Sequence, residues 1–130
     1  MDYQISVFFA GGFALLQLPI TMAVGIRRST TGIMFLHDGD DVLLRRNRAH
    51  ANYTETVPIT LIAMAAAEFG GAPDALLWSG GAFLLAGRTL HYYVIVFTAA
   101  RGWPRASAML LTFAAMTGLG GYALYAGFAG

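Results

Sequence analysis

The sequence contains no cysteine and no lysine, and charged residues make up only 12% of its 130 residues. Without cysteine the chain has no disulfide, no thiolate ligand for a metal and no thiol nucleophile of its own. Eight arginines nearly balance seven acidic residues, so the chain lacks the basic field of a nucleic-acid module, and we expect no nucleic-acid partner. A soluble domain carries about 25% charged residues. The scarcity of charge therefore argues against a disordered segment and against an ordinary cytoplasmic globule.

Apolar residues are abundant and come in long uninterrupted runs. They make up 57% of the chain, and the mean hydropathy is +0.59. Residues 3–26 and residues 106–129 each contain no charged side chain. A helix of such a length measures about 36 Å, enough to cross a hydrocarbon core of about 30 Å. The sequence predicts an integral, multi-pass membrane protein that contacts the lipid bilayer directly.

Breaks between the apolar runs divide the chain into four expected helices. We place them at about residues 3–28, 43–69, 74–100 and 105–129, within one transmembrane domain covering residues 1–130. The Gly-Gly-Ala-Pro run at 70–73 and the Gly-Trp-Pro run at 102–104 are typical of tight connections. Short connections between helices of similar length predict an all-α, up-down four-helix bundle.

The arginines predict how the bundle is oriented. Five of them lie in the first connection and at the adjoining ends of helices one and two, and two more flank the third connection. The second connection and both termini contain none. By the positive-inside rule, the arginine-bearing connections face the cytoplasm and both termini face outward.

A polar face follows the first half of the second helix. Arg45, Arg48, Asn52 and Glu55 are spaced by three, four and three residues, which places them on one side of a helix. Charged groups at the entry to a membrane are costly beside lipid, so this face should look toward a polar cavity, the bundle interior or a neighbouring subunit. The spacing favours a ligand site, and the alternative is an intrahelical ladder of ion pairs.

The third helix contributes a second polar pair, Arg88 and His91, three residues apart. Arg88 is too far from either end of its apolar stretch to reach the membrane surface. It either serves a buried site or pairs with Glu55 of the second helix. His91 is either part of the same site or a hydrogen-bonded packing residue.

Two further features concern the membrane boundary and metals. Arg105 stands at the start of the fourth helix, where it serves either as a topology anchor or as a residue leaning over the mouth of a site between helices.

The three histidines have no metal-ligand spacing, so no metal site is expected.

Residues 48–58, Arg-Ala-His-Ala-Asn-Tyr-Thr-Glu-Thr-Val-Pro, resemble the Arg-Ala-x-x-Asn-x-x-Glu-x-x-Pro signature of the MAPEG family. These are membrane-associated proteins in eicosanoid and glutathione metabolism. The Arg-Thr-Leu-His run at 88–91 is similar to the Arg-x-x-His of the family's third helix. The likeness extends over nearly the whole chain and is strongest to the short bacterial branch, which implies a bacterial inner-membrane location.

The resemblance implies a homotrimer whose sites lie between adjacent subunits, open to the cytoplasm, with glutathione as the cofactor. Arg48, Asn52 and Glu55 would then hold the glutathione backbone, and Arg28 (or Arg27) would reach a carboxylate. Arg88 and His91 would complete the binding set. Arg105 would face the sulfur as the catalytic residue.

Two functions are compatible with this resemblance. The first is a glutathione transferase or peroxidase that acts on hydrophobic small molecules or lipids, with the thiolate stabilised by arginine. The second is a non-catalytic membrane protein that binds a lipid or presents it to a partner. Ile95 stands where the synthases of the family have a tyrosine that contacts glutathione, and Thr56 stands where a tyrosine often follows the glutamate of the second helix. Both differences favour the second function.

Overall fold

The computed structural model describes residues 4–98 and 102–129, and every regular element in these two ranges is a helix. The helices are α1 (Ile5–Thr31), α2 (Asp41–Phe69), α3 (Asp74–Phe97) and α4 (Trp103–Ala129). The predicted all-α fold with four helices is confirmed. α1 continues three residues beyond its expected end. α3 ends at Phe97, and the expected helical residues 99 and 100 lie outside the described ranges.

Local chemistry explains where the first connection begins and ends. α1 stops because Gly32 adopts a left-handed conformation with φ of 74° and donates its N–H to the Arg28 carbonyl. α2 starts at Asp41, directly after the N-cap residue Asp40, whose carboxylate accepts a 2.7 Å hydrogen bond from the backbone N–H of Leu43. Both arginines at the end of α1 therefore lie close to the beginning of α2.

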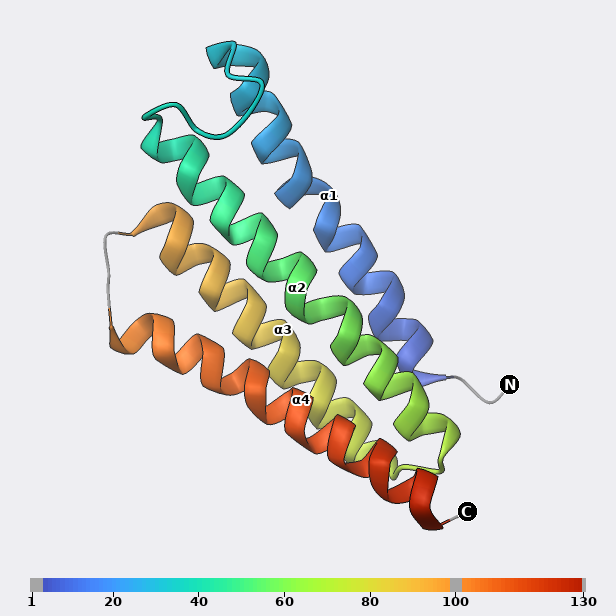
Figure 1. Cartoon of the computed structure of the whole chain (residues 1–130). Coiled ribbons are helices and arrows are strands. Elements are labelled where there is room, and N and C mark those ends of the chain that lie inside the picture. The colour runs from blue at the N-terminus through green and yellow to red at the C-terminus, as the bar shows by residue number, and fades with distance from the viewer. Residues whose placement is uncertain (1–3, 99–101, 130) are drawn as a thin grey trace.

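The four helices run side by side, alternating in direction (Figure 1). α2 contacts all three other helices, and α3 and α4 share the most extensive interface. Among the helix pairs that touch, α1 and α3 have the smallest interface. The α1–α2 connection, the end of α3 and the start of α4 lie toward one end of the bundle, and the start of α1 and the end of α4 lie at the other (Figure 1). α1 consequently leaves an open seam along α3.

Small residues let the helices approach closely at the centre. A Cβ atom on Gly81 of α3 would lie 2.2 Å from the Phe9 ring of α1, and one on Gly87 would lie 2.9 Å from the Ala108 carbonyl oxygen of α4. Phe9 itself is 6% exposed and belongs to a continuous apolar core with Leu84. The tight α3–α4 interface depends on the missing side chain at position 87.

At the opposite end of the bundle, Glu68 near the end of α2 caps the start of α1. Its carboxylate accepts from the backbone N–H groups of Ile5 (2.5 Å) and Ser6 (3.0 Å), and from the Ser6 hydroxyl. Gln4, the residue that precedes the helix, makes no such side-chain bond. The first turn of α1 is therefore completed by a different helix.

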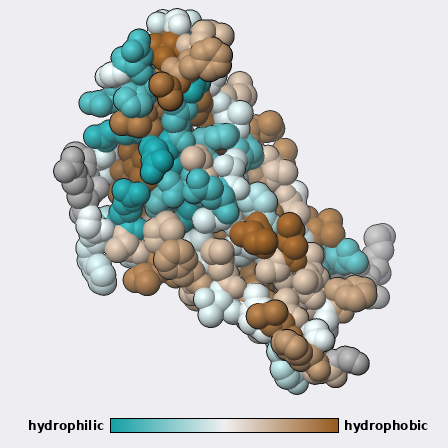
Figure 2. Space-filling model, viewed as in Figure 1, coloured by the Kyte–Doolittle hydropathy of each residue, from teal (hydrophilic) through white to brown (hydrophobic). Residues whose placement is uncertain are grey.

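Much of the outer surface is apolar. On α1 alone, Val7, Phe8, Leu15, Leu18 and Met22 are each more than half exposed, which is unusual in a soluble monomer. α1 and α4 are long and apolar enough to cross a membrane by length and composition. Hydrophilic residues gather toward the end that carries the α1–α2 connection, and hydrophobic ones are prominent over the rest of the visible face (Figure 2).

We expect Gly87→Ala to destabilise the bundle by about 1–3 kcal/mol, because the added methyl group would overpack the α3–α4 interface. Thermal unfolding in detergent measures the effect. Gly120→Ala is the matched control, since a Cβ at that position of α4 would have nothing within 4 Å. Equal melting temperatures for the two variants would contradict this account of the interface.

Candidate functional site

The polar face of α2 points away from the bundle. Arg45, Arg48 and Glu55 are exposed, and Asn52 is half-buried. The Asn52 side-chain N–H donates to the Arg48 carbonyl at 2.8 Å, and Arg45 donates to the Thr98 carbonyl at 2.7 Å. These residues therefore form a polar surface of a single chain and are not enclosed by it.

The alternative of an ion-pair ladder along α2 is wrong for the described residues. Within residues 4–98 and 102–129 the ion pair is that of Arg27 with Asp40, at 2.7 Å. Neither Arg48 nor Glu55 comes within ion-pair distance of an opposite charge in these ranges. Their charges are available to a ligand or to a second chain.

Arg88 lies in the middle of the bundle, only 3% exposed, and joins α3 to two other helices. Its Nε donates to Thr112 Oγ1 at 3.0 Å and one Nη donates to Met109 Sδ at 3.2 Å, both on α4. The other Nη donates to the Asn52 carbonyl (3.4 Å) and to Thr56 Oγ1 (3.3 Å) on α2. Arg88 thus contacts the backbone of Asn52 from the interior of the bundle.

The expected alternative for Arg88, a pairing with Glu55, is wrong. Glu55 is exposed, and the Arg88 guanidinium is satisfied by neutral oxygen and sulfur acceptors. Glu55 projects outward from α2, whereas Arg88 approaches the same helix from the bundle interior. The two residues therefore face different sides of the α2 backbone.

His91 is buried, 2% exposed, one turn from Arg88 on α3. Its Nε2 has no hydrogen-bond partner in the part of the chain that the structure describes, which is rare for a buried polar atom. His91 is therefore a buried polar residue whose Nε2 still needs a partner. Arg105, the expected catalytic residue, is exposed in the first turn of α4.

Arg27 and Arg28 hold the α1–α2 connection together. Arg27 donates from Nε and Nη2 to the Asp40 carboxylate, with the shortest distance 2.7 Å. Arg28 donates to the carbonyls of Ile33 (3.2 Å) and Met34 (2.9 Å), and to Asn47 Oδ1 at 3.4 Å. Within one chain, both guanidinium groups stabilise the connection that precedes the polar face.

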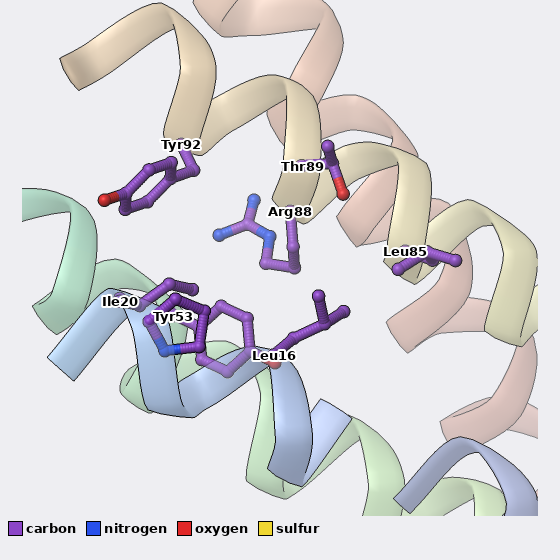
Figure 3. A pocket seen from close by; sticks show the side chains of 8 residues that line it. Leu16, Ile20, Tyr53, Leu85, Arg88, Thr89 and Tyr92 are labelled. Carbon is purple, nitrogen blue, oxygen red and sulfur yellow. The ribbon is translucent and has the colours of Figure 1, made fainter. Parts of the chain in front are cut away.

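A cavity of about 190 Å³ opens where α1, α2 and α3 meet (Figure 3). Its walls are mainly apolar, with Leu16, Pro19 and Ile20 on α1 facing Leu85 and neighbouring residues of α3. Tyr53 and Arg88 also line it. The Tyr53 hydroxyl donates to the Phe13 carbonyl at 2.7 Å. No motif in the sequence predicted this cavity.

The helices, the apolar surface and the polar face of α2 together define a membrane protein built as a four-helix bundle. The comparison with protein families then gives the particular assignment. The sequence model of the MAPEG family matches residues 6–125, and the chain belongs to this family.

Named relatives support the assignment. The inner membrane protein YecN of Escherichia coli (strain K12) is 31% identical over 90 residues, which covers 69% of this chain and 69% of YecN. The protein of the same name in a second Escherichia coli strain matches equally well. No solved structure matches the sequence.

We expect Asp40→Asn to lower the melting temperature at pH 7 and to lower it less near pH 3. Hydrogen bonds from Arg27 and from the Leu43 N–H hold the pKa of Asp40 below its usual value. A carboxylate with a lowered pKa stabilises the fold above its unfolded-state pKa, and loses that contribution as the pH falls through its folded-state pKa. Melting curves of both proteins at the two pH values test this. A difference that persists unchanged at pH 3 would contradict it.

Proposed function

We propose that this MAPEG protein is a glutathione-dependent transferase or peroxidase for hydrophobic electrophiles, working at a site formed between chains of a homotrimer. The observation that carries the proposal is the pair of unpartnered charges on α2. Arg48 and Glu55 are exposed on a helix of a membrane bundle, and neither forms an ion pair within the described ranges. Charges in this setting are expected to have partners.

A second copy of the chain would cover the exposed face of α2. The surface groups there have both signs of charge, so a purely apolar neighbour would leave them unsatisfied. Lipid chains would do the same. A polar ligand held between two copies satisfies the charges of both. A ligand position between two copies would explain why the polar face of α2 is exposed in a single chain.

The donor set suits glutathione chemically. Arginine forks bind carboxylates, and glutathione has two. Glu55 suits its ammonium group, and Asn52 offers a side-chain carbonyl and N–H. The orphaned Nε2 of His91 gives a further polar atom in need of a partner. Arg88 acts here by positioning Asn52, since its own N–H groups are directed at α2 and α4.

Glutathione would supply the nucleophile that this cysteine-free chain lacks. Its thiolate would form a C–S bond with the electrophile while a leaving group such as halide departs. In the peroxidase reaction, two glutathione molecules would reduce a hydroperoxide to the alcohol and water and become glutathione disulfide. The thiol loses its proton more easily beside a positive charge. Arg105 is exposed in the first turn of α4 and is the residue we assign to this role. An apolar substrate would arrive through the bilayer, which the exposed apolar surface allows.

The second candidate function is a non-catalytic membrane protein that binds a lipid or presents it to a partner. Ile95 and Thr56 favour it, because neither supplies the phenol that the resemblance leads one to expect at these two positions. Thr56 is also engaged within the chain, donating to the Asn52 carbonyl and accepting from Arg88. The experiments below separate the two functions.

The proposed orientation places the arginine-rich end in the cytoplasm, with a multi-pass topology and both termini outward. The first connection and the adjoining helix ends hold most of the arginines. The positive-inside rule assigns such connections to the cytoplasm. Glutathione would then reach the site from the cytoplasmic side.

We expect glutathione to raise the melting temperature of the detergent-solubilised protein, since a ligand of the native state stabilises it by mass action. Glu55→Gln should weaken this response about tenfold in glutathione concentration, because one charged hydrogen bond is lost. Asp74→Asn, at the opposite end of the bundle, is the control. No shift at saturating glutathione would rule out this cofactor.

We expect Arg105→Ala to lower turnover of 1-chloro-2,4-dinitrobenzene with glutathione by about 100-fold, the effect of removing one preorganised charge from a reacting centre. The glutathione-dependent rise in melting temperature should remain. A rise without any turnover in the wild type would favour the non-catalytic function. Chemical cross-linking that yields dimers but no trimers would contradict the proposed assembly.

A further inference from the structure

The seam between α1 and α3 contains a groove longer than the cavity in Figure 3. A second cavity, of about 230 Å³, lies next to the first one and is lined by Phe8, Phe9, Gly12 and Phe13 of α1. Leu16 of α1 and Leu85 of α3 line both cavities. The two cavities therefore follow one another along the same pair of helices.

The length and chemistry of this groove fit one hydrocarbon chain. From Phe8 to Ile20 the α1 backbone advances about 18 Å, comparable with one leaflet, half of a hydrocarbon core of about 30 Å. Leu16 and Leu85 are each 40% exposed, so the groove is open at the surface. An apolar groove at this depth of a membrane protein is filled by hydrocarbon, because water has too few polar partners there.

Arg46 stands at one end of the groove. It lies two helical turns from Tyr53 on the same face of α2, and Tyr53 lines the groove. Its Nη1 donates to the Ala23 carbonyl of α1 at 2.8 Å, one turn beyond Ile20. Arg46 is half-buried, and no carboxylate among residues 4–98 and 102–129 lies within ion-pair distance of it.

We propose that this groove binds an anionic phospholipid, with one acyl chain between α1 and α3 and the phosphate on Arg46. The guanidinium keeps further N–H donors besides the one used on Ala23, and its fork matches phosphate oxygens. The lipid belongs to the leaflet at the arginine-rich end of the bundle.

Two neighbouring residues do not compete for this role. Arg88 lines the groove, but its Nε and both Nη atoms bond to α2 and α4. Arg45 is adjacent to Arg46 in the sequence, but it donates to Thr98 at the end of α3. The site is separate from the proposed glutathione site, because it lies on the α1–α3 seam and not on the exposed face of α2.

Native mass spectrometry of the detergent-solubilised protein tests this proposal. The full chain is mixed with equal amounts of palmitoyl-oleoyl phosphatidylglycerol and phosphatidylcholine, and the lipid retained per chain is counted. We expect about one retained phosphatidylglycerol, favoured about tenfold over phosphatidylcholine, because the choline ammonium of the latter offsets the phosphate charge that Arg46 attracts. Arg46→Gln should abolish the preference, and Arg46→Lys should keep part of it.

Two matched controls separate the groove from general lipid contact. Arg45→Gln removes a neighbouring arginine and should leave the preference unchanged. Leu85→Trp fills the groove and should reduce retention of both lipids, whereas Leu110→Trp, at a site on α4 that is 56% exposed, should not. The groove variant keeps the test decisive if Arg46→Gln does not fold. Undiminished phosphatidylglycerol retention in Arg46→Gln, or equal retention in the two tryptophan variants, would overturn the proposal.

Discussion

Arg88 places a positive charge in the middle of an apolar bundle, and the packing of α2, α3 and α4 depends on how that charge is satisfied. A lone buried guanidinium is strongly unfavourable unless its N–H groups find acceptors. Here the acceptors are hydroxyl, carbonyl and thioether groups drawn from α2 and α4. Their positions fix the separation of these helices from α3. These bonds involve only the interior side of α2, so Glu55 and Arg48 remain exposed on its outward side.

The sequence was sufficient to predict the fold class and the approximate extent of every helix. The long uncharged runs predicted membrane-spanning helices, because the length of a run in a helix can be compared directly with the thickness of a membrane. The Gly/Pro-rich connections predicted where the helices are separated. The ends were less predictable. α1 passes through Arg27 and Arg28 to Thr31, since arginine is a good helix former and the stop comes only with Gly32.

The candidate site was predictable in part, because residues on one helix face share that face whatever the tertiary structure. Arg48, Asn52 and Glu55 were placed correctly on one side of α2. The partner of Arg88 was not predictable, because a long flexible side chain can reach several helices, and neutral acceptors such as Thr112 and Met109 have no sequence signature. The pairing of Asp40 with Arg27 was not predictable either, because it depends on the path of the α1–α2 connection.

The cap that Glu68 gives to α1 has a consequence for how the protein is made. The acceptor follows its first donor, the Ile5 N–H, by 63 residues in the chain. When α1 leaves the ribosome, its first amides still lack this acceptor, and they gain it only after α2 has been synthesised almost to its end. Completion of the first turn of α1 is therefore coupled to insertion of α2. The α1–α2 hairpin is the smallest part of the nascent chain that can satisfy the backbone N–H groups at the start of α1.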